Sequence, residues 1–482
     1  MRERLGAALV CAALAMTGHV GAQSPAAAPP LATMLAPLIA AAVTPGERLS
    51  VVVMEAGSGR VLFEREPAAA LNPASDTKLL TAATALAVLG ADRRFTTTLD
   101  GSQVGDTVAG PLVFRSDGDP SLSTGDVYAM ARELVAAGVR RVEGDLVVDD
   151  RALGAEHLPP AFEQQPDESA PFRASVSAVS IDENALSVRV RPGAAGAPAV
   201  VSAEPRGYVD VESSLTTTAE GPSTLNIAVT PLPDGRARVR VTGSVPASAR
   251  SAVYRRRLDS PSLAAGWAMR SALEDLGVRV SGTTRVGVAP DGLTTLATHR
   301  SHALSALLYE VGKESNNFYA EMTLLAIAAT PVAGLVTFQR GTERVLDWCR
   351  GAGVDTRGMV LRNGSGLYDA NRVSARQIAQ VLRANWRRPA VRDEFIAQLA
   401  VGGGDGTLRN RLRIAGAERM VRAKTGTLDD VIALSGYVLA PDPSRTLVFS
   451  ILANGVRGRA APTRQLADEI VTTLVGVVRA HR

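Results

Sequence analysis

The sequence contains very little lysine. Only three of its 52 lysine and arginine residues are lysine, at Lys78, Lys313 and Lys424, and the other 49 are arginine. A lysine can lose its proton when burial and nearby positive charge lower its pKa, whereas arginine stays protonated at any relevant pH. These three positions are therefore candidates for a role that arginine cannot perform.

Cysteine and histidine are scarce as well, which excludes several mechanisms. Cys11 lies in an apolar N-terminal segment, so Cys349 would be the one cysteine of a mature chain and no intramolecular disulfide could form. Since no histidine lies near Cys349 in sequence, we expect a buried thiol and not a nucleophile. The histidines are not spaced as a metal pair, and neither a Gly-x-Ser-x-Gly motif nor a P-loop is present. An enzyme with this sequence would need a base other than histidine, and we expect no metal site.

Aromatic residues and excess charge of one sign are also limited. Aromatic residues make up 4% of the 482 positions, and the net charge is +4 without any basic run. Nucleic-acid binding therefore has little support, and we expect no nucleic-acid partner. The length suits two or three domains with sizeable hydrophobic cores.

The only long apolar run lies at the N-terminus. It follows Arg2 and Arg4, extends from Leu5 to Met16, and leads to small residues that end at Ala22. This pattern is typical of a signal peptide, so we expect residues 1–22 to be removed near Ala22 and the protein to be periplasmic or secreted. No later stretch approaches the roughly 18 apolar residues that cross a bilayer, so no transmembrane anchor is expected.

Changes in composition and periodicity divide the rest of the chain. Residues 23–35 are rich in alanine and proline and are expected to form a flexible lead-in. Residues 36–95 and 291–482 contain the longer helical patterns, whereas residues 96–290 consist mainly of short alternating segments. We therefore predict an α+β domain made from two parts, interrupted by a β-rich insertion of two subdomains.

The same patterns predict individual elements. A β-hairpin is expected from 48–56 and 60–65, and a helix is expected from Ser75 to Leu89. Further predicted helices span 126–137, 302–312, 318–329, 339–351, 374–386 and 465–480, and predicted strands span 431–440 and 446–455. The last helix carries an apolar stripe that we expect to pack on the sheet, with a peripheral membrane contact as the alternative.

Ser75 and Lys78 form a Ser-x-x-Lys motif at a predicted helix start. One helical turn places the two side chains on the same face, where unpaired backbone N–H groups can stabilise an oxyanion. A serine hydroxyl is a weak nucleophile until a base takes its proton, and a lysine of lowered pKa can be that base. The motif alone is weak evidence, because a capping serine beside a solvated lysine has the same pattern.

Two further motifs contain the other lysines. Lys313 precedes the Ser-x-Asn element Ser315–Asn317 on a loop between helices, and Lys424 begins the Lys-Thr-Gly element 424–427 at a strand edge. Ser-x-x-Lys, Ser-x-Asn and Lys-Thr-Gly, in this order, are the motifs of penicillin-binding proteins and class A β-lactamases. Finding all three in one exported chain indicates a single active site.

With these motifs the chain resembles the D-alanyl-D-alanine carboxypeptidase/endopeptidase family, the class C low-molecular-mass penicillin-binding proteins. The resemblance covers essentially the whole mature chain. Ser75 and Ser315 lie 240 positions apart, as the large insertion of that family implies, whereas class A β-lactamases have a short segment there. Other matching segments are GDPSL (118–122), VEGDLVVDD (142–150), KESNNFYAE (313–321), NGSGL (363–367) and GDGTLRNR (404–411).

The resemblance implies a fold and a reaction. The two-part domain would be a β-lactamase/transpeptidase-like catalytic domain, with an antiparallel sheet flanked by helices. The enzyme would be a serine-type DD-peptidase that acts on peptidoglycan stem peptides as a carboxypeptidase and on D-alanyl-diaminopimelate cross-links as an endopeptidase. β-Lactam antibiotics would inhibit it by acylation, and no cofactor is implied.

The resemblance also implies catalytic roles. Ser75 would attack the carbonyl between the two D-alanines, with Lys78 as its general base. Ser315 would relay a proton to the leaving group with help from Lys424. Lys313 would support its loop and help to lower the pKa of Lys78, or would simply be solvated.

Four further residues are implied in substrate binding. Asn317 would hydrogen-bond the substrate backbone. Lys424, Thr425 and Thr427 would bind the terminal carboxylate, and Gly426 would let the substrate approach the backbone closely. The backbone N–H groups of Ser75 and Thr427 would form the oxyanion hole.

Two positions depart from the family pattern, and two other functions stay open. Asn316 stands where many relatives have aspartate, which argues against a β-lactamase, and Asn363 likewise replaces an aspartate and its salt bridge. The first alternative is an exported serine β-lactamase or esterase with the same acylation step. The second is a catalytically silent penicillin-binding sensor or scaffold.

Overall fold

The computed structural model describes residues 31–329 and 335–480. The predicted signal peptide at 1–22 and most of the predicted lead-in lie outside the described residues. The remainder of the lead-in was predicted wrongly, because residues 31–35 begin helix α1 (Leu31–Ala42).

Helix α1 forms because its apolar stripe has a partner far away in the sequence. Leu31, Leu35 and Ile39 recur every four residues and are buried. They pack in one hydrophobic cluster with helix α10 (Ala460–Ala480). The alanine- and proline-rich composition of the segment suggested flexibility because that partner is not visible in the local sequence.

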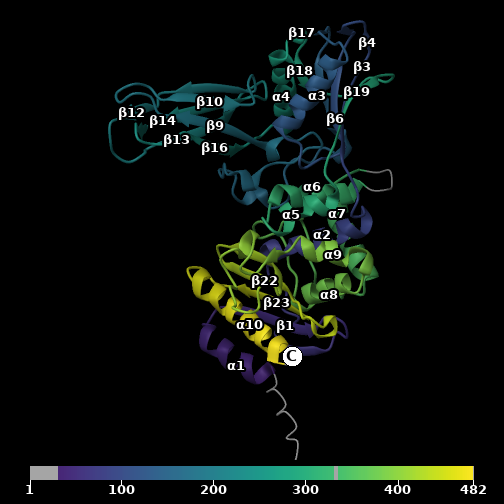
Figure 1. The fold of residues 1–482 in the computed structure, drawn as a ribbon, viewed down its shortest axis with the longest axis vertical. Coiled ribbons are helices and arrows are strands. Elements are labelled where there is room, and N and C mark those ends of the chain that lie inside the picture. The colour runs from purple at the N-terminus through teal and green to yellow at the C-terminus, as the bar shows by residue number, and fades with distance from the viewer. Residues whose placement is uncertain (1–30, 330–334, 481–482) are drawn as a thin grey trace, which may run out of the picture.

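A six-stranded sheet forms the centre of the main domain. Its strand order is β2-β1-β23-β22-β21-β20, and every neighbouring pair is antiparallel. The strands are β1 (Arg48–Glu55), β2 (Val61–Arg65), β20 (Ala400–Val401), β21 (Val421–Leu428), β22 (Val431–Val438) and β23 (Leu447–Asn454). Because β1 pairs with β23, the two parts of the chain that flank the insertion share one sheet (Figure 1).

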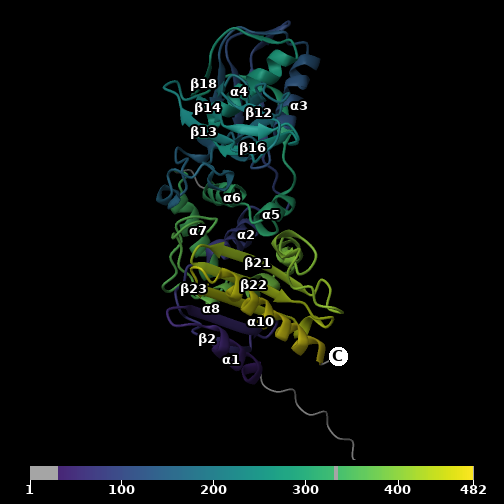
Figure 2. The ribbon, with the colours of Figure 1, turned by 90° about the vertical axis from the view of Figure 1, so that its left-hand side faces the viewer.

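Both faces of this sheet are covered by helices. Successive side chains of a strand point to opposite faces, so Val51 and Val53 of β1 pack towards α1 and α10, while Val52 and Met54 pack towards the other layer. α10 therefore lies on the sheet, as expected from its stripe (Figure 2). The other layer contains α2 (Thr77–Val88), α5 (Leu304–Gly312), α6 (Asn317–Ala329), α7 (Phe338–Gly351), α8 (Ala375–Trp386) and α9 (Pro389–Ala397).

Helix α2 lies inside this layer and carries the first motif. Its residues Thr77 to Leu86 are all buried, and they include the polar side chains of Lys78 and three threonines. A 3₁₀ turn (Ala74–Asp76) precedes it, so the predicted helix start is a tight turn that contains Ser75. Cys349 of α7 is buried as expected, and burial raises the pKa of its thiol to about 12.

The insertion leaves and re-enters the main domain through two paired strands. β3 (Thr96–Gly101) and β19 (Thr294–Arg300) are antiparallel neighbours in a five-stranded sheet of order β18-β8-β6-β3-β19. The inserted sheet therefore extends to Arg300, beyond the predicted end at residue 290. A second sheet of order β17-β7-β5-β4 lies in the same part of the insertion.

Two separate hydrophobic clusters divide the insertion into two units. The core of the first unit is formed by α3 (Thr124–Ala136), α4 (Pro261–Asp275), β5 (Thr107–Val108), β6 (Leu112–Ser116), β7 (Arg141–Val142), β8 (Leu146–Asp149) and β17 (Arg279–Val280), with β3 and β19. β4 (Gln103–Val104) and β18 (Thr284–Val286) complete its sheets. The second contains β9 (Ala185–Arg191), β10 (Val200–Glu204), β11 (Val209–Ser213), β12 (Thr216–Thr218), β13 (Asn226–Pro231), β14 (Ala237–Thr242), β15 (Ser244–Pro246) and β16 (Ala252–Arg257), and it projects to one side of the molecule (Figure 1). The predicted α+β class with a β-rich insertion is confirmed. Within the described residues, no helix is long and apolar enough to cross a membrane.

Candidate active site

Lys78 lies at the centre of a compact hydrogen-bond network. Its Nζ atom is 3.0 Å from Ser75 Oγ, 2.8 Å from Asn317 Oδ1 and 2.7 Å from the backbone oxygen of Ser365. The first two motifs are thereby brought together although they are far apart in the sequence. Lys78 itself is buried.

The surroundings of Lys78 favour its neutral form. Burial and then the positive charge of Lys424 hold the pKa of Lys78 well below its usual value, against the opposing charges of Glu321 and Asp76. A neutral amine has two N–H donors and one lone pair. The two donors match the oxygens of Asn317 and Ser365, which leaves the lone pair for the Ser75 hydroxyl proton. This geometry suits a general base for Ser75.

Lys424 makes the matching contact with the second motif. Its Nζ atom donates to Ser315 Oγ at 2.7 Å and to the backbone oxygen of Thr425 at 2.7 Å. Burial lowers the pKa of Lys424 to about 8, while the charge of Asp76 opposes that change. Ser315 has a φ of 60°, a left-handed conformation that is uncommon for a residue with a side chain and is often found at functional sites.

The insertion contacts the second motif directly. Asn317 Nδ2 donates to the backbone oxygen of Phe172 at 2.9 Å, and Asn316 Nδ2 donates to Glu183 Oε2 at 3.0 Å. Asn317 thus links Lys78 to the insertion through its two amide atoms. The role of Asn317 in binding substrate backbone stays a prediction.

The third motif lies on β21, against the turn that holds Ser75. A Cβ atom at Gly426 would be 2.9 Å from the backbone oxygen of Pro73 and 3.1 Å from Ala74 Cβ, so glycine allows this close packing. Thr425 is buried and donates to Thr407 Oγ1 at 2.8 Å. Thr427 lines the cavity described below.

Lys313 takes part in a different interaction. Its Nζ atom contacts the backbone oxygen of Leu399 at 2.9 Å and Asp405 Oδ2 at 2.7 Å. It therefore links its own loop to the loop around Asp405. The main charge effects on the pKa of Lys78 are those of Lys424, Glu321 and Asp76, so a contribution from Lys313 stays a prediction.

The NGSGL segment (363–367) packs against the first motif and contacts Lys78 through the backbone oxygen of Ser365. Glu321, which is buried, accepts the backbone N–H groups of Gly364 at 2.9 Å and Ser365 at 2.8 Å, and so fixes the carbonyl that faces Lys78. Gly366 has a φ of 76°, and a Cβ atom there would lie 1.8 Å from the backbone oxygen of Ala74. The segments KESNNFYAE and NGSGL were recognised from the sequence as family matches, but no role was predicted for Glu321.

Asn363, which stands where relatives usually have aspartate, is held by hydrogen bonds to backbone groups. Its Oδ1 atom accepts the Gly366 N–H at 2.9 Å, and its Nδ2 atom donates to the backbone oxygens of Pro160 and Leu367 at 3.0 and 3.2 Å. An amide serves both as donor and as acceptor here. No ion pair is therefore needed at this buried position, as expected from the departure at Asn363.

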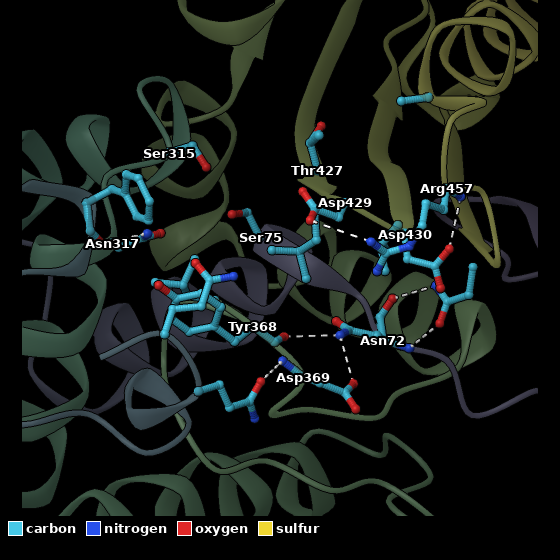
Figure 3. Close-up of a pocket in the computed structure, with 18 of the residues that line it drawn as sticks. Asn72, Ser75, Ser315, Asn317, Tyr368, Asp369, Thr427, Asp429, Asp430 and Arg457 are labelled. Carbon is cyan, nitrogen blue, oxygen red and sulfur yellow. Dashed lines mark hydrogen bonds and ion pairs between the residues drawn. The ribbon is translucent and has the colours of Figure 1, made fainter. Parts of the chain in front are cut away.

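A cavity of about 970 Å³ opens over the nucleophile. Four of the predicted site residues line it, namely Ser75, Ser315, Asn317 and Thr427 (Figure 3). Lys78, Lys424, Thr425 and Gly426 are not among its lining residues. Residues that sequence analysis missed also line it, and they include Asn72, Gln164, Gln165, Phe172, Tyr368, Asp369, Arg372, Asp429, Asp430, Asn454 and Arg457. Across residues 31–329 and 335–480, no group of three or more His, Cys, Asp or Glu side chains is arranged to hold a metal ion.

Comparison with known proteins identifies the family. The model of the D-Ala-D-Ala carboxypeptidase 3 (S13) family matches residues 31–474. The chain belongs to this family. Membership of the S13 family confirms the resemblance and, with it, the expectation of a serine-type D-Ala-D-Ala carboxypeptidase.

Individual S13 relatives and a solved structure agree with this assignment. The chain is 39% identical to a D-alanyl-D-alanine carboxypeptidase of Actinomadura sp. (strain R39) over 429 residues, which are 85% of this chain and 78% of the relative. It is 25% identical to D-alanyl-D-alanine carboxypeptidase DacB of Haemophilus influenzae over 414 residues, or 82% of each chain. The crystal structure of penicillin-binding protein 4 from Haemophilus influenzae has the same fold, with a TM-score of 0.78 and 23% identity over 92% of this chain and 99% of that chain. A second structure of that protein contains a β-lactam.

Proposed function

We propose that this protein cleaves peptidoglycan stem peptides through an acyl-enzyme on Ser75, both at D-alanyl-D-alanine termini and at D-alanyl-diaminopimelate cross-links. The observation that carries the proposal is the contact of Ser75 Oγ with Lys78 Nζ at 3.0 Å. The lysine is buried and its pKa is held far below the usual value, so it can take the serine proton.

Acylation would begin when the Ser75 hydroxyl gives its proton to Lys78 and its oxygen attacks the carbonyl carbon between the D-alanines. The backbone N–H groups of Ser75 and Thr427 would stabilise the tetrahedral oxyanion. The carbon–nitrogen bond would then break, and the leaving amine would take the proton that Lys78 had accepted, relayed through the Ser315 hydroxyl, so that Lys78 is neutral again. The contact of Ser315 with Lys424 at 2.7 Å supports this relay.

Hydrolysis of the acyl-enzyme would complete the cycle. A water molecule would give a proton to Lys78 and attack the ester carbonyl, and Ser75 would recover its proton as the ester bond breaks. A β-lactam would form the same ester on Ser75. We expect that ester to be long-lived, so that the drug acts as an inhibitor.

The third motif would hold the carboxylate at the substrate terminus. A protonated Lys424 would supply the positive charge, and the hydroxyl of Thr427, which lines the cavity, would donate to the carboxylate. Thr425 would join it only by releasing its hydrogen bond to Thr407 Oγ1. Gly426 keeps this part of β21 close to the Ser75 turn, because a Cβ atom there would meet Pro73 and Ala74. Substrate carboxylate and nucleophile would thus be fixed relative to each other.

Export would place the enzyme where peptidoglycan lies. The N-terminal pattern of a basic start, an apolar segment and small residues before Gln23 supports cleavage near Ala22. The mature enzyme would act in the periplasm or outside the cell.

Digestion of purified cross-linked muropeptides tests the proposal. We expect wild type to convert pentapeptides to products lighter by one alanine residue and to split cross-linked dimers, both seen by mass spectrometry. Ser75→Ala should do neither. Loss of alanine without dimer cleavage would limit the enzyme to carboxypeptidase activity. Rapid turnover of penicillin would favour a β-lactamase, and penicillin labelling without any peptide product would favour a silent scaffold.

A further inference from the structure

Asp76, which follows Ser75 in the chain, is a buried carboxyl group without a hydrogen-bond partner. The residue is 0% exposed, and among the described residues neither carboxyl oxygen has a partner at hydrogen-bond geometry, because the nearby Ser435 hydroxyl donates to Ser450 Oγ at 2.9 Å. An isolated ionised carboxylate is very costly to bury, so a buried one is normally paired or protonated. The presence of Asp76 beside the nucleophile therefore needs an electrostatic explanation.

The elements packed around Asp76 supply two lysines and a hydroxyl. Asp76 ends a turn that packs on β21 and β22. Lys424 of β21 and Lys78 of α2 act on it as positive charges, and both lysines are buried. Ser435 of β22 lies opposite Lys424 in the sheet, with its hydroxyl beside Asp76. On the other side of Lys78 lies the acidic group of Glu321.

Asp76 and Lys424 favour each other's charged form. Burial raises the pKa of Asp76 to about 7, against the opposing effects of the Ser435 hydroxyl, Lys424 and Lys78. Burial also lowers the pKa of Lys424 to about 8, and Asp76 is the charge that opposes this.

The two lysines depend on Asp76 to different degrees. For Lys78, the repulsion by Lys424 is the largest charge effect, and the attractions of Glu321 and Asp76 are smaller. For Lys424, Asp76 is the charge that stabilises its protonated form. A single carboxyl group can therefore keep one amine charged while the other stays neutral.

We propose that Asp76 is a positioning residue that keeps Lys424 protonated, and so able to bind the substrate carboxylate, while Lys78 gives up its proton. The inference rests on the proposed function, which needs one neutral and one charged lysine in the same buried site. Asp76 touches neither substrate nor Ser75 Oγ in this role and acts through Lys424.

The pH dependence of the wild-type enzyme follows from the two lysines. Acylation needs a neutral Lys78, so its rate rises with pH until that amine has lost its proton. It also needs a charged Lys424, so the rate falls again near pH 8. We expect a bell-shaped profile whose alkaline limb reports on Lys424.

The test compares the alkaline limbs of wild type, Asp76→Asn and Asp76→Ala. The second-order rate of acylation by a fluorescent penicillin, which carries a carboxylate, is measured from pH 5 to pH 10. Without the carboxyl group, the alkaline limb should move to lower pH by about one unit or more. Asp76→Asn adds amide N–H donors at a buried position and can therefore fold poorly. Asp76→Ala removes the acid without adding such donors, so it provides a second variant for the same measurement. Asp119→Asn is the matched control, since Asp119 is equally buried but lies in the insertion.

The outcomes separate the inference from the proposed function. An alkaline limb at the same pH in both variants and in wild type would overturn the role of Asp76. A lower rate at every pH without movement of the limb would mean a structural role and would also overturn it. Wild type that is not acylated by penicillin at any pH would instead refute the proposed function.

Discussion

Replacing Lys78 with arginine is expected to slow acylation by about 10²- to 10⁴-fold, the usual contribution of a general base. The change keeps a long side chain that ends in nitrogen donors, but it replaces a neutral amine with a permanently charged guanidinium. Arginine cannot release its proton, so no lone pair would face the Ser75 hydroxyl. The measurement is the rate at which a fluorescent penicillin labels the protein, together with release of D-alanine from a pentapeptide.

Lys313→Arg provides the matched control for this experiment. Lys313 is one of the three lysines, and it contacts Leu399 and Asp405 instead of the nucleophile. A guanidinium can make the same ion pair with Asp405, so this variant should label at close to the wild-type rate. If Lys78→Arg were also fully active, the general-base assignment would be wrong.

Truncation of Glu321 to alanine is expected to lower the free energy of unfolding by about 2–5 kcal/mol, because it leaves two buried backbone N–H groups unpaired. Those groups belong to Gly364 and Ser365, and Glu321 itself is 0% exposed. Movement of the Ser365 carbonyl would also disturb Lys78, so penicillin labelling should slow at temperatures where the variant is folded. The measurement is the calorimetric midpoint of thermal unfolding, followed by labelling at a temperature well below it.

Glu321→Gln separates hydrogen bonding from charge at this position. The amide oxygen of glutamine can still accept a backbone N–H, so the variant should lose less stability than Glu321→Ala. Equal midpoints for wild type and Glu321→Ala would show that the acid does not hold the NGSGL segment.

The three motifs could be predicted from the sequence because each has a short, specific spacing. Ser75 and Lys78 are separated by one helical turn, and this local relation survives in the structure as a contact of 3.0 Å. Most helices were predicted because their apolar periodicity is strong, whereas the antiparallel sheet was implied by the family resemblance. The family resemblance then joined motifs that lie hundreds of residues apart.

Other parts of the site could not be predicted because they depend on contacts between distant segments. Glu321 lies in the KESNNFYAE segment, which the sequence marks. The backbone N–H groups that it binds, at 364 and 365, reach it only because α6 packs on the NGSGL segment. Phe172 and Gln164 reach the cavity from the insertion, and no local pattern marks them. Asp76 was not singled out from the sequence, because only the packing of its turn on β21 and β22 shows that it is buried.

The most direct test of the account is the mass of the tryptic peptide 66–78 after brief exposure of the protein to penicillin. This peptide contains Ser75 as its only serine and ends at Lys78. We predict that it gains the mass of one penicillin, with fragment ions that place the addition on Ser75, and that Ser75→Ala carries no addition and releases no D-alanine. An addition on another peptide, or D-alanine release by Ser75→Ala, would contradict the account.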